Sequence, residues 1–436
     1  MRKIILVLLV ALPFLSIAQD KSNQKKATLM ASEIEEKIIE WRRYFHQNPE
    51  LSNREFKTAD KIAQILKGLG IEVQTKVAHT GVVGILKGGK PGPVVALRAD
   101  IDALPVTERG DIPFISKVKA NYNGIETGVM HACGHDGHMA VLLGAAEVLS
   151  GMKKELKGTV KFIFQPAEEG PPLGEEGGAK LMIKEGVLKN PDVDVIFGLH
   201  ISAGLPAGQI SYRSAGIMAS SDRFVIKVKG KQTHGSTPWG GVDPVVTSSQ
   251  IINSLQTVVS RQTPLTDNIA VVSVGMVKAG LRYNIIPEEV EIVGTIRTLD
   301  TKVQDNVHAS ITRIATKTAE SMGATADVAI EKRAPVTYND PSLTAKMVPT
   351  FERVVGKENA VITNPTTAAE DFSFYQQQVP GLFFFLGAMY SDKDLNTGLG
   401  THHSPDFKIN EEGLLVGVKT MVNLTLDYMD NPMTKK

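Results

Sequence analysis

The segment from Met130 to His138 contains three histidines and the only cysteine of the chain. A cysteine thiolate beside imidazole nitrogens is a typical ligand set for zinc or another first-row metal. Gly134 stands between Cys133 and His135, and glycine adopts backbone angles that other residues resist, so both neighbours can converge on one ion. The simpler alternative is a helix N-terminus with incidental histidines. Cys133 and His135 are therefore candidate ligands, and His131 and His138 are expected to be structural neighbours.

Further candidate ligands lie in three other parts of the sequence. Adjacent carboxylates at a strand end point in different directions, so one can bind a metal while the other faces the substrate. The second would accept a proton from an attacking water and pass it to the leaving amine. On its own an Ala-Glu-Glu-Gly sequence is more often a solvated turn, but the cysteine–histidine cluster favours the catalytic interpretation. The candidates are the pair Glu168–Glu169, then His200, and then the pair His402–His403.

Three buried strand-like runs must position most of these residues. Buried strands that alternate with helices are typical of an α/β fold with a largely parallel sheet. Ligands bind beyond the carboxyl ends of the strands in such sheets, which is where these side chains fall. The runs 94–97, 160–164 and 193–199 are followed by Asp100 and Asp102, by Glu168 and Glu169, and by His200.

The pattern changes at about residue 215. Residues 215–330 predict the order β-α-β-β-α-β, which is the ferredoxin-like plan, and indicate an inserted α+β domain. The catalytic α/β domain would then consist of residues 32–214 and 331–436. Its first helix is expected to start at a capping box formed by Ser32 and Glu35.

The N-terminus has the pattern of a secretory signal peptide over residues 1–18. A short basic start precedes an apolar run, and small residues stand before a cleavage site near Ala18. The run is shorter than the ~20 residues that span a bilayer, although an uncleaved anchor is the alternative. We expect residues 19–31 to be a polar leader, no membrane span in the mature chain, and export to a periplasm or secretion.

Composition excludes several classes of protein. A chain of 436 residues predicts two or three domains, and its net charge of +1 offers no basic surface for nucleic acid. A single cysteine cannot form a disulfide within the chain.

Seven motifs in order make the mature chain resemble the M20 metallopeptidase clan. Within it the chain is similar to the M20D amidohydrolases, which include hippurate hydrolases, N-acyl-amino-acid amidohydrolases and the plant hydrolases of auxin–amino acid conjugates. The motifs are Arg98-Ala-Asp-Ile-Asp-Ala-Leu-Pro105, Met130-His-Ala-Cys-Gly-His-Asp136, Gln165-Pro-Ala-Glu-Glu169, Gly198-Leu-His200, Asn284-Ile-Ile-Pro287, Gly294-Thr-Ile-Arg297 and His403-Ser-Pro405.

The resemblance implies a two-domain M20-like architecture and a site for two divalent metal ions, which could be Zn, Mn, Co or Ni. It implies Glu168 as general base and Asp102 as an acid that supports the ligands. Asp100 stands where other M20 branches have a metal-binding histidine. His402 remains an alternative to His403, which the His-x-Pro spacing favours. The implied metal ligands are Cys133, His135, Glu169, His200 and His403.

The resemblance also assigns roles to the inserted domain, which would act as a lid and form a homodimer. His234 would reach the active site of the partner subunit and help to hold the oxyanion. Apart from the resemblance, side-chain chemistry suggests that Asn284 and Arg297 bind a free carboxylate on the product side, with the Arg297 guanidinium as the fork. The alternative is that they are strand-face residues without substrate contact.

The sequence therefore predicts an exported metal-dependent amidohydrolase that acts on the linear amide of N-acyl amino acids or related small conjugates. The alternatives are a dipeptidase or carboxypeptidase of the same clan and a non-catalytic binding protein on the same fold. An intact Glu168 and the full set of candidate ligands disfavour the binding protein.

Overall fold

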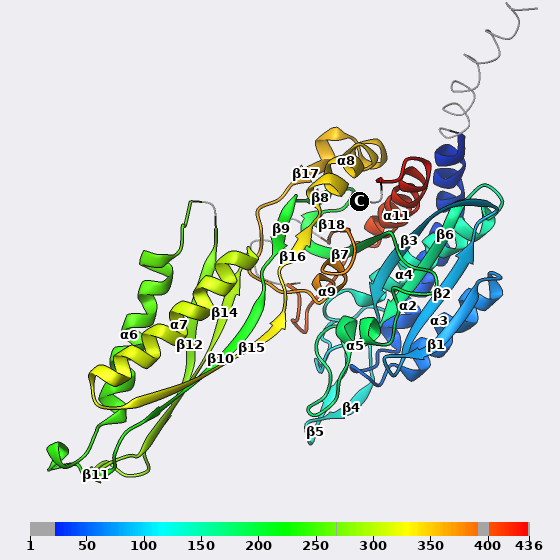
Figure 1. Ribbon diagram of the computed structural model, residues 1–436. Coiled ribbons are helices and arrows are strands. Elements are labelled where there is room, and N and C mark those ends of the chain that lie inside the picture. The colour runs from blue at the N-terminus through cyan, green and yellow to red at the C-terminus, as the bar shows by residue number, and fades with distance from the viewer. Residues whose placement is uncertain (1–21, 267, 391–400, 435–436) are drawn as a thin grey trace, which may run out of the picture. The chain divides into compact units, whose positions relative to one another are not determined.

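The computed structural model describes residues 22–266, 268–390 and 401–434, so the signal peptide predicted for residues 1–18 lies outside them. The chain divides into two compact units (Figure 1). The second unit comprises Ala215–Tyr338 and Asn364–Ser373, and the rest of the chain forms the first. Residues 364–373 belong to the second unit because they hydrogen-bond to its start: the Thr366 N–H donates to Ile217 O at 3.0 Å. The predicted insertion, 215–330, did not include this return segment.

An eight-stranded sheet forms the frame of the first unit. Its four central strands, β6, β3, β7 and β18, are parallel to one another, and both flanks contain antiparallel pairs. This mixed sheet with a parallel centre agrees with the predicted α/β class. In order across the sheet the strands are β1 (Glu72–Val77), β2 (Gly81–Lys87), β6 (Lys157–Gln165), β3 (Lys90–Asp100), β7 (Val195–Pro206), β18 (Gly381–Met389), β8 (Ile210–Tyr212) and β17 (Ala360–Ile362).

Helices cover this sheet, and a small hairpin extends from it. Helices α4 and α11 contact the central strands, whereas α3 contacts β1 and β2. The helices are α2 (Glu35–Gln47), α3 (Phe56–Gly68), α4 (His135–Gly151), α5 (Gly178–Lys184), α8 (Pro341–Val355), α9 (Ser373–Gln376) and α11 (Glu412–Asp430), and the hairpin is β4 (Lys119–Tyr122) with β5 (Ile125–Gly128).

The N-terminal region differs from the predicted polar leader. Residues 22–33 are helical, and α2 follows after a turn at Ile34. Ala27 and Ala31 are buried in the core of the first unit, so this helix belongs to the fold. The predicted capping box is absent from α2, because Ser32 lies within the preceding helix and its hydroxyl donates to Thr28 O at 3.2 Å. Small apolar residues on one face were enough to pack that face against the core, although the helix also contains lysines.

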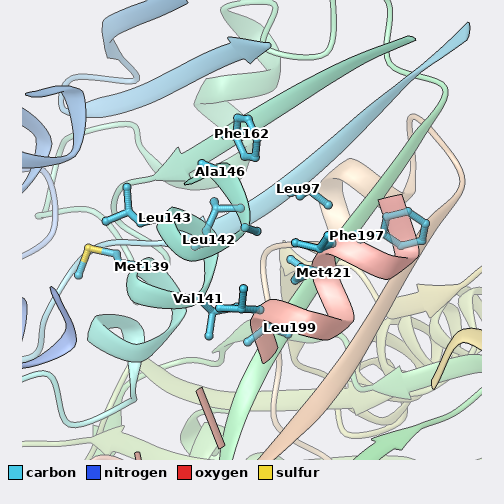
Figure 2. Packing of buried hydrophobic residues seen from close by; sticks show 14 of the residues in the cluster. Leu97, Met139, Val141, Leu142, Leu143, Ala146, Phe162, Phe197, Leu199 and Met421 are labelled. Atoms are coloured by element: carbon cyan, nitrogen blue, oxygen red, sulfur yellow. The ribbon is translucent and has the colours of Figure 1, made fainter. Parts of the chain in front are cut away.

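Helix α4 lies at the centre of the first unit's core. Nearly all of its residues are buried, which is typical of a helix inside a core. Figure 2 shows Leu142 and Leu143 of α4 in the cluster that also contains Phe162 of β6 and Met421 of α11. Gly144 permits the close approach of α11, because a Cβ there would lie 2.7 Å from a methyl of Val418. Helices α2 and α11 and the central strands all pack against α4. This packing fixes the position of the helix and of the candidate ligands at its start.

The second unit has the predicted ferredoxin-like order. Four antiparallel strands pair in the order β12-β14-β10-β15, and α6 and α7 pack on the sheet around Phe224, Ile251 and Ile311. A two-stranded ribbon, β11 (Thr233–His234) with β13 (Ile285–Ile286), extends the unit. The main elements are β10 (Ser221–Lys229), α6 (Pro244–Gln262), β12 (Ala270–Ala279), β14 (Glu289–Thr298), α7 (Thr301–Ser321) and β15 (Thr325–Ala334), with β9 (Ala215–Met218) and β16 (Thr337–Asn339) at its ends.

Across the described ranges, we find no helix with both the length and the apolar character that crossing a membrane requires.

Candidate metal centre

The candidate ligands meet where the central strands separate. Strand β7 pairs with β3 as far as Gly198, opposite Arg98, and then continues beside β18 to Pro206. His200 therefore lies inside β7, not at the end of a strand as predicted, because pairing with β18 extends the strand beyond its pairing with β3. The separation of β3 and β7 leaves room at the carboxyl edge of the sheet.

Cys133 and His135 enter this space from a left-handed turn. Gly134 has φ +98° and precedes the first residue of α4, His135. Both ligand candidates are buried, at 6% and 1% relative exposure. The turn aims a thiol and an imidazole into the same volume, as the sequence predicted.

The distances between donor atoms match those around a metal ion. Cys133 Sγ lies 3.4 Å from His200 Nε2 and 3.2 Å from His403 Nε2. His403 Nε2 also lies 3.1 Å from Glu169 Oε1. A tetrahedral ion with metal–sulfur and metal–nitrogen distances of about 2.3 and 2.0 Å separates such donors by roughly 3.5 Å. The spacing is thus close to that of ligands on a shared ion.

Two of the donor sets among the described residues share Cys133, and another combines His135 with Glu168 and Glu169. Cys133 could therefore donate its sulfur to a metal held by either of the first two sets. His135 Nε2 is buried and has no hydrogen-bond partner among the described residues, so a bound ion would satisfy it. The donor chemistry and this atom both fit a divalent metal. The sets are Cys133–His135–His200, Cys133–Glu169–His403 and His135–Glu168–Glu169, and in each the ligand atoms lie within 4.8 Å of one another.

His402 and His403 differ in their surroundings. His402 is directed to the backbone, with Nδ1 3.2 Å from Cys133 O and Nε2 accepting the Ala203 N–H at 3.3 Å. His403 has φ +64° and directs Nε2 to the thiol and to Glu169. Of the two, His403 has the geometry of a ligand.

Carboxylates behind the ligands control their charge. His135 Nδ1 lies 2.8 Å from Asp102 O, which leaves Nε2 directed toward the other donors. Burial opposes a charge on His135, but Asp100 and Asp102 outweigh it and raise its pKa to about 10. Burial, Glu169 and Glu168 raise the pKa of the Cys133 thiol well above its ordinary value. A thiolate at this position therefore needs a nearby cation.

Asp102 also holds the loop of the carboxylate pair. Its Oδ2 accepts the Ser52 hydroxyl at 2.7 Å and the Glu169 N–H at 3.1 Å. The side chain is buried, and burial opposes its ionisation, but the hydrogen bond from His135 lowers its pKa. This position agrees with the predicted supporting role, and Ser52 is a partner that the sequence did not indicate.

Asp100 and His138 form a support for β7. The Asp100 carboxylate lies 2.5 Å from His138 Nδ1 and accepts from the buried Arg98 guanidinium at 2.8 Å. His138 Nε2 accepts the N–H of Ile201 at 2.8 Å, so its Nδ1 carries the proton. Burial lowers the pKa of His138 to about 4, which keeps the ring neutral. Both nitrogens are engaged, so His138 supports the residue after His200 and is not available as a ligand.

Sequence reasoning missed a buried ionic cluster that includes Asp136, in the first turn of α4. Asp136 accepts from Arg42 and contacts His46 Nδ1, each at 2.8 Å, and His46 Nε2 lies 2.9 Å from Glu108. Burial and Arg42 oppose protonation of His46, but the two carboxylates outweigh them and raise its pKa. The only local signal was an arginine and a histidine at i and i+4 on one helix, which does not reveal their partners.

The predicted lid residues separate into two groups within the second unit. His234 pairs with Ile285, and the Gly235 N–H donates to Asn284 O at 2.9 Å, so His234 and Asn284 belong to the same ribbon. Strand β14 follows the ribbon in the sequence and begins at Glu289. Arg297 lies eight residues further along this strand, which is roughly 26 Å at the rise of a strand. It donates to the Thr295 hydroxyl at 2.5 Å and to Ile296 O at 3.0 Å. The structure thus brings His234 and Asn284 together and leaves Arg297 apart.

Comparisons with known proteins agree with this geometry. Residues 96–427 match the peptidase family M20/M25/M40. The chain is 41% identical over 398 residues to thermostable carboxypeptidase 2 of Saccharolobus solfataricus, covering 91% of this chain and 96% of the relative. It is 38% identical over 395 residues to N-acetylcysteine deacetylase of Bacillus subtilis, covering 90% and 97%. The crystal structure of Bacillus subtilis YXEP, described as a dinuclear metal-binding peptidase from the M20 family, has a TM-score of 0.77 at 35% identity and covers 91% of this chain and 99% of that chain.

The family match extends from β3 into α11 and includes every candidate ligand of the metal centre. The names of the relatives describe hydrolases that cleave amides, and they confirm the resemblance to the amidohydrolases of the M20 clan. The chain therefore belongs to peptidase family M20/M25/M40 and is a metal-dependent amide hydrolase of that family.

Proposed function

We propose that this protein hydrolyses the amide bond of N-acyl amino acids or related small amino-acid conjugates, with Glu168 as general base. The observation that carries the proposal is the position of Glu168 in one donor cluster with His135 and Glu169. Glu169 also belongs to the cluster of Cys133 and His403, whereas Glu168 does not, which favours Glu169 as the metal ligand and Glu168 as the general base. The N-acetylcysteine deacetylase activity named for a relative supports an N-acyl amino acid as substrate.

Each residue of the centre has a distinct task in this mechanism. Cys133, His135, Glu169, His200 and His403 would hold two divalent ions, which when bound polarise the amide carbonyl and lower the pKa of the attacking water. Glu168 takes the proton from that water and returns it to the leaving nitrogen. Asp102 keeps Glu169 in place through the backbone, and His138 keeps β7 in place beside His200.

We further propose that the second unit completes the site from a partner subunit of a homodimer. His234 is exposed, and the segments that adjoin its ribbon in the sequence also expose large apolar side chains. Trp239, Leu281 and Tyr283 have relative exposures of 80%, 106% and 95%, which is typical of a surface that another chain covers. His234 and Asn284 would then act together on the substrate, and Arg297 would bind a carboxylate elsewhere. Export after cleavage near Ala18 is part of the same proposal and is supported by the N-terminal sequence.

A second candidate is a carboxypeptidase or dipeptidase, because one relative is named a carboxypeptidase. Both candidates use the same metal centre and differ in what the substrate carries at its amino end. A panel of N-acetyl, N-benzoyl and long-chain N-acyl amino acids, assayed beside dipeptides, separates them by kcat/KM.

The paired variants Glu168→Gln and Glu169→Gln test the mechanism. Glu168→Gln should retain metal and lose turnover by roughly 10²- to 10⁴-fold, the usual contribution of a general base. Glu169→Gln should lower metal content, measured by elemental analysis after dialysis. If instead Glu168→Gln loses metal and Glu169→Gln keeps it, the two roles are exchanged. If Glu168→Gln keeps full turnover, the proposed base is wrong.

A further inference from the structure

Residues 50–55 form hydrogen bonds to the loops at the active-site edge of the sheet, although no candidate metal ligand lies among them. The Ala103 N–H donates to Glu50 O at 2.8 Å, and Leu51 forms a bridge with Ala103. Ser52 donates to Asp102, as described above, and the Asn53 amide donates to Glu176 O at 3.0 Å. This segment therefore contacts the loop after β3 and the region that follows the carboxylate pair.

Glu55 is the member of this segment that contacts the loop of the carboxylate pair. Its Oε1 accepts the Ala167 N–H at 2.9 Å, and its Oε2 lies 2.5 Å from the Thr80 hydroxyl. The side chain is fully buried, so these hydrogen bonds lie away from bulk solvent. Burial and the nearby Asp102 raise the pKa of Glu55 to about 8, so a neutral side chain of the same shape fits the site.

Ala167 immediately precedes Glu168 and has an unfavourable backbone conformation. Its φ of +52° is left-handed, a conformation that is unfavourable for a residue with a Cβ. A conformation of this kind persists only where its surroundings enforce it. The hydrogen bond to Glu55 holds the N–H on one side of Glu168, and the bond from Glu169 N–H to Asp102 holds the other. Ala167 and Glu168 thus lie between two anchored peptide groups, the one before Ala167 and the one after Glu168.

We propose that Glu55 is a positioning residue for Glu168: through the Ala167 N–H it maintains the left-handed turn that directs the general base. The inference rests on the proposed role of Glu168. Glu169 has its own anchor in Asp102, so loss of Glu55 should displace the base without releasing the metal ligand. Misplacement of a reacting group by about 1 Å can reduce turnover by 10²-fold.

Four variants test this inference in the metal-loaded full-length protein. Glu55→Ala should lower kcat by about 10- to 100-fold, with KM changed less than threefold and metal content unchanged. Glu55→Gln should restore kcat to within threefold of wild type, because its amide accepts from Ala167 and donates to Thr80. Glu55→Asp retains the carboxyl group but is too short to reach Ala167, so it should behave like Glu55→Ala. Glu50→Ala is the matched control: it removes the carboxylate that accepts the Thr58 N–H at 2.8 Å in the same segment, and kcat should not change.

If Glu55→Ala is insoluble, Glu55→Asp carries the test. Wild-type kcat in Glu55→Asp, or a kcat loss in Glu50→Ala equal to that in Glu55→Ala, would overturn the inference and indicate a general structural role. Glu168→Gln is measured in parallel. If Glu168→Gln loses most of its kcat while Glu55→Ala and Glu55→Asp keep wild-type kcat, the inference about Glu55 is wrong and the proposed function stands. If Glu168→Gln keeps full activity, both the proposed function and the inference are wrong.

Discussion

Gly134→Ala should weaken metal binding, because the turn between Cys133 and His135 requires a positive φ. The glycine has φ +98°, and an added Cβ would lie no closer than 3.4 Å to Ile201, which is an ordinary contact. The cost is therefore backbone strain alone, about 1–2 kcal/mol for a residue with a Cβ. If the metal-free turn relaxes and metal binding restores it, that cost corresponds to roughly a 5- to 30-fold higher metal Kd at 1.4 kcal/mol per tenfold.

Gly186→Ala is the matched control for this prediction. Gly186 has φ +85°, and an added Cβ there would meet nothing within 4 Å, so the substitution creates similar strain away from the metal centre. Metal affinity is measured by competition with a chelator of known Kd, and stability by urea unfolding of the metal-free protein. Gly186→Ala should lose stability and keep its metal affinity. Equal Kd values for Gly134→Ala and wild type would refute the reasoning that this turn forms the metal centre.

Two further predictions concern the second unit and the buried ionic cluster. His234→Ala should reduce turnover and leave metal content unchanged, and mixing it with Glu168→Gln protein should recover up to about one quarter of the wild-type activity if subunits exchange and His234 acts across a dimer. No recovery after demonstrated exchange would place His234 in the chain that it serves or outside catalysis. His46→Gln should lower the free energy of unfolding of the metal-free protein most at pH 6 and less at pH 9. The folded-state pKa of His46 is raised, so its contribution is fully present below the unfolded value of about 6.5 and is lost as pH rises through the folded value. A difference that is the same at both pH values, in urea titrations of wild type and variant, would contradict this linkage.

Local patterns in the sequence determined the elements and the type of chemistry. The β-α-β-β-α-β order predicted for residues 215–330 is the order found in the second unit, where the alternating strand β10 buries Phe224 and exposes Lys227. The Cys133-Gly134-His135 turn was also predictable, because its ligands are neighbours and glycine alone permits the angle. Such features depend on periodicity and on intrinsic backbone preference, which a short window of sequence contains.

Contacts between distant segments determined the rest. His200 lies within β7 because β18, almost 200 residues later, extends the strand. His403 and His402 differ in the atom of Cys133 that each ring meets, the thiol for His403 and the backbone carbonyl for His402, and Cys133 lies about 270 residues earlier in the chain. Glu55 looks in sequence like a surface carboxylate at the start of a helix, and only the fold buries it against Ala167. Burial and hydrogen-bond partners are properties of the packed chain, so residue type and spacing alone determined the metal chemistry, whereas only the tertiary structure decided which groups hold the catalytic carboxylates in place.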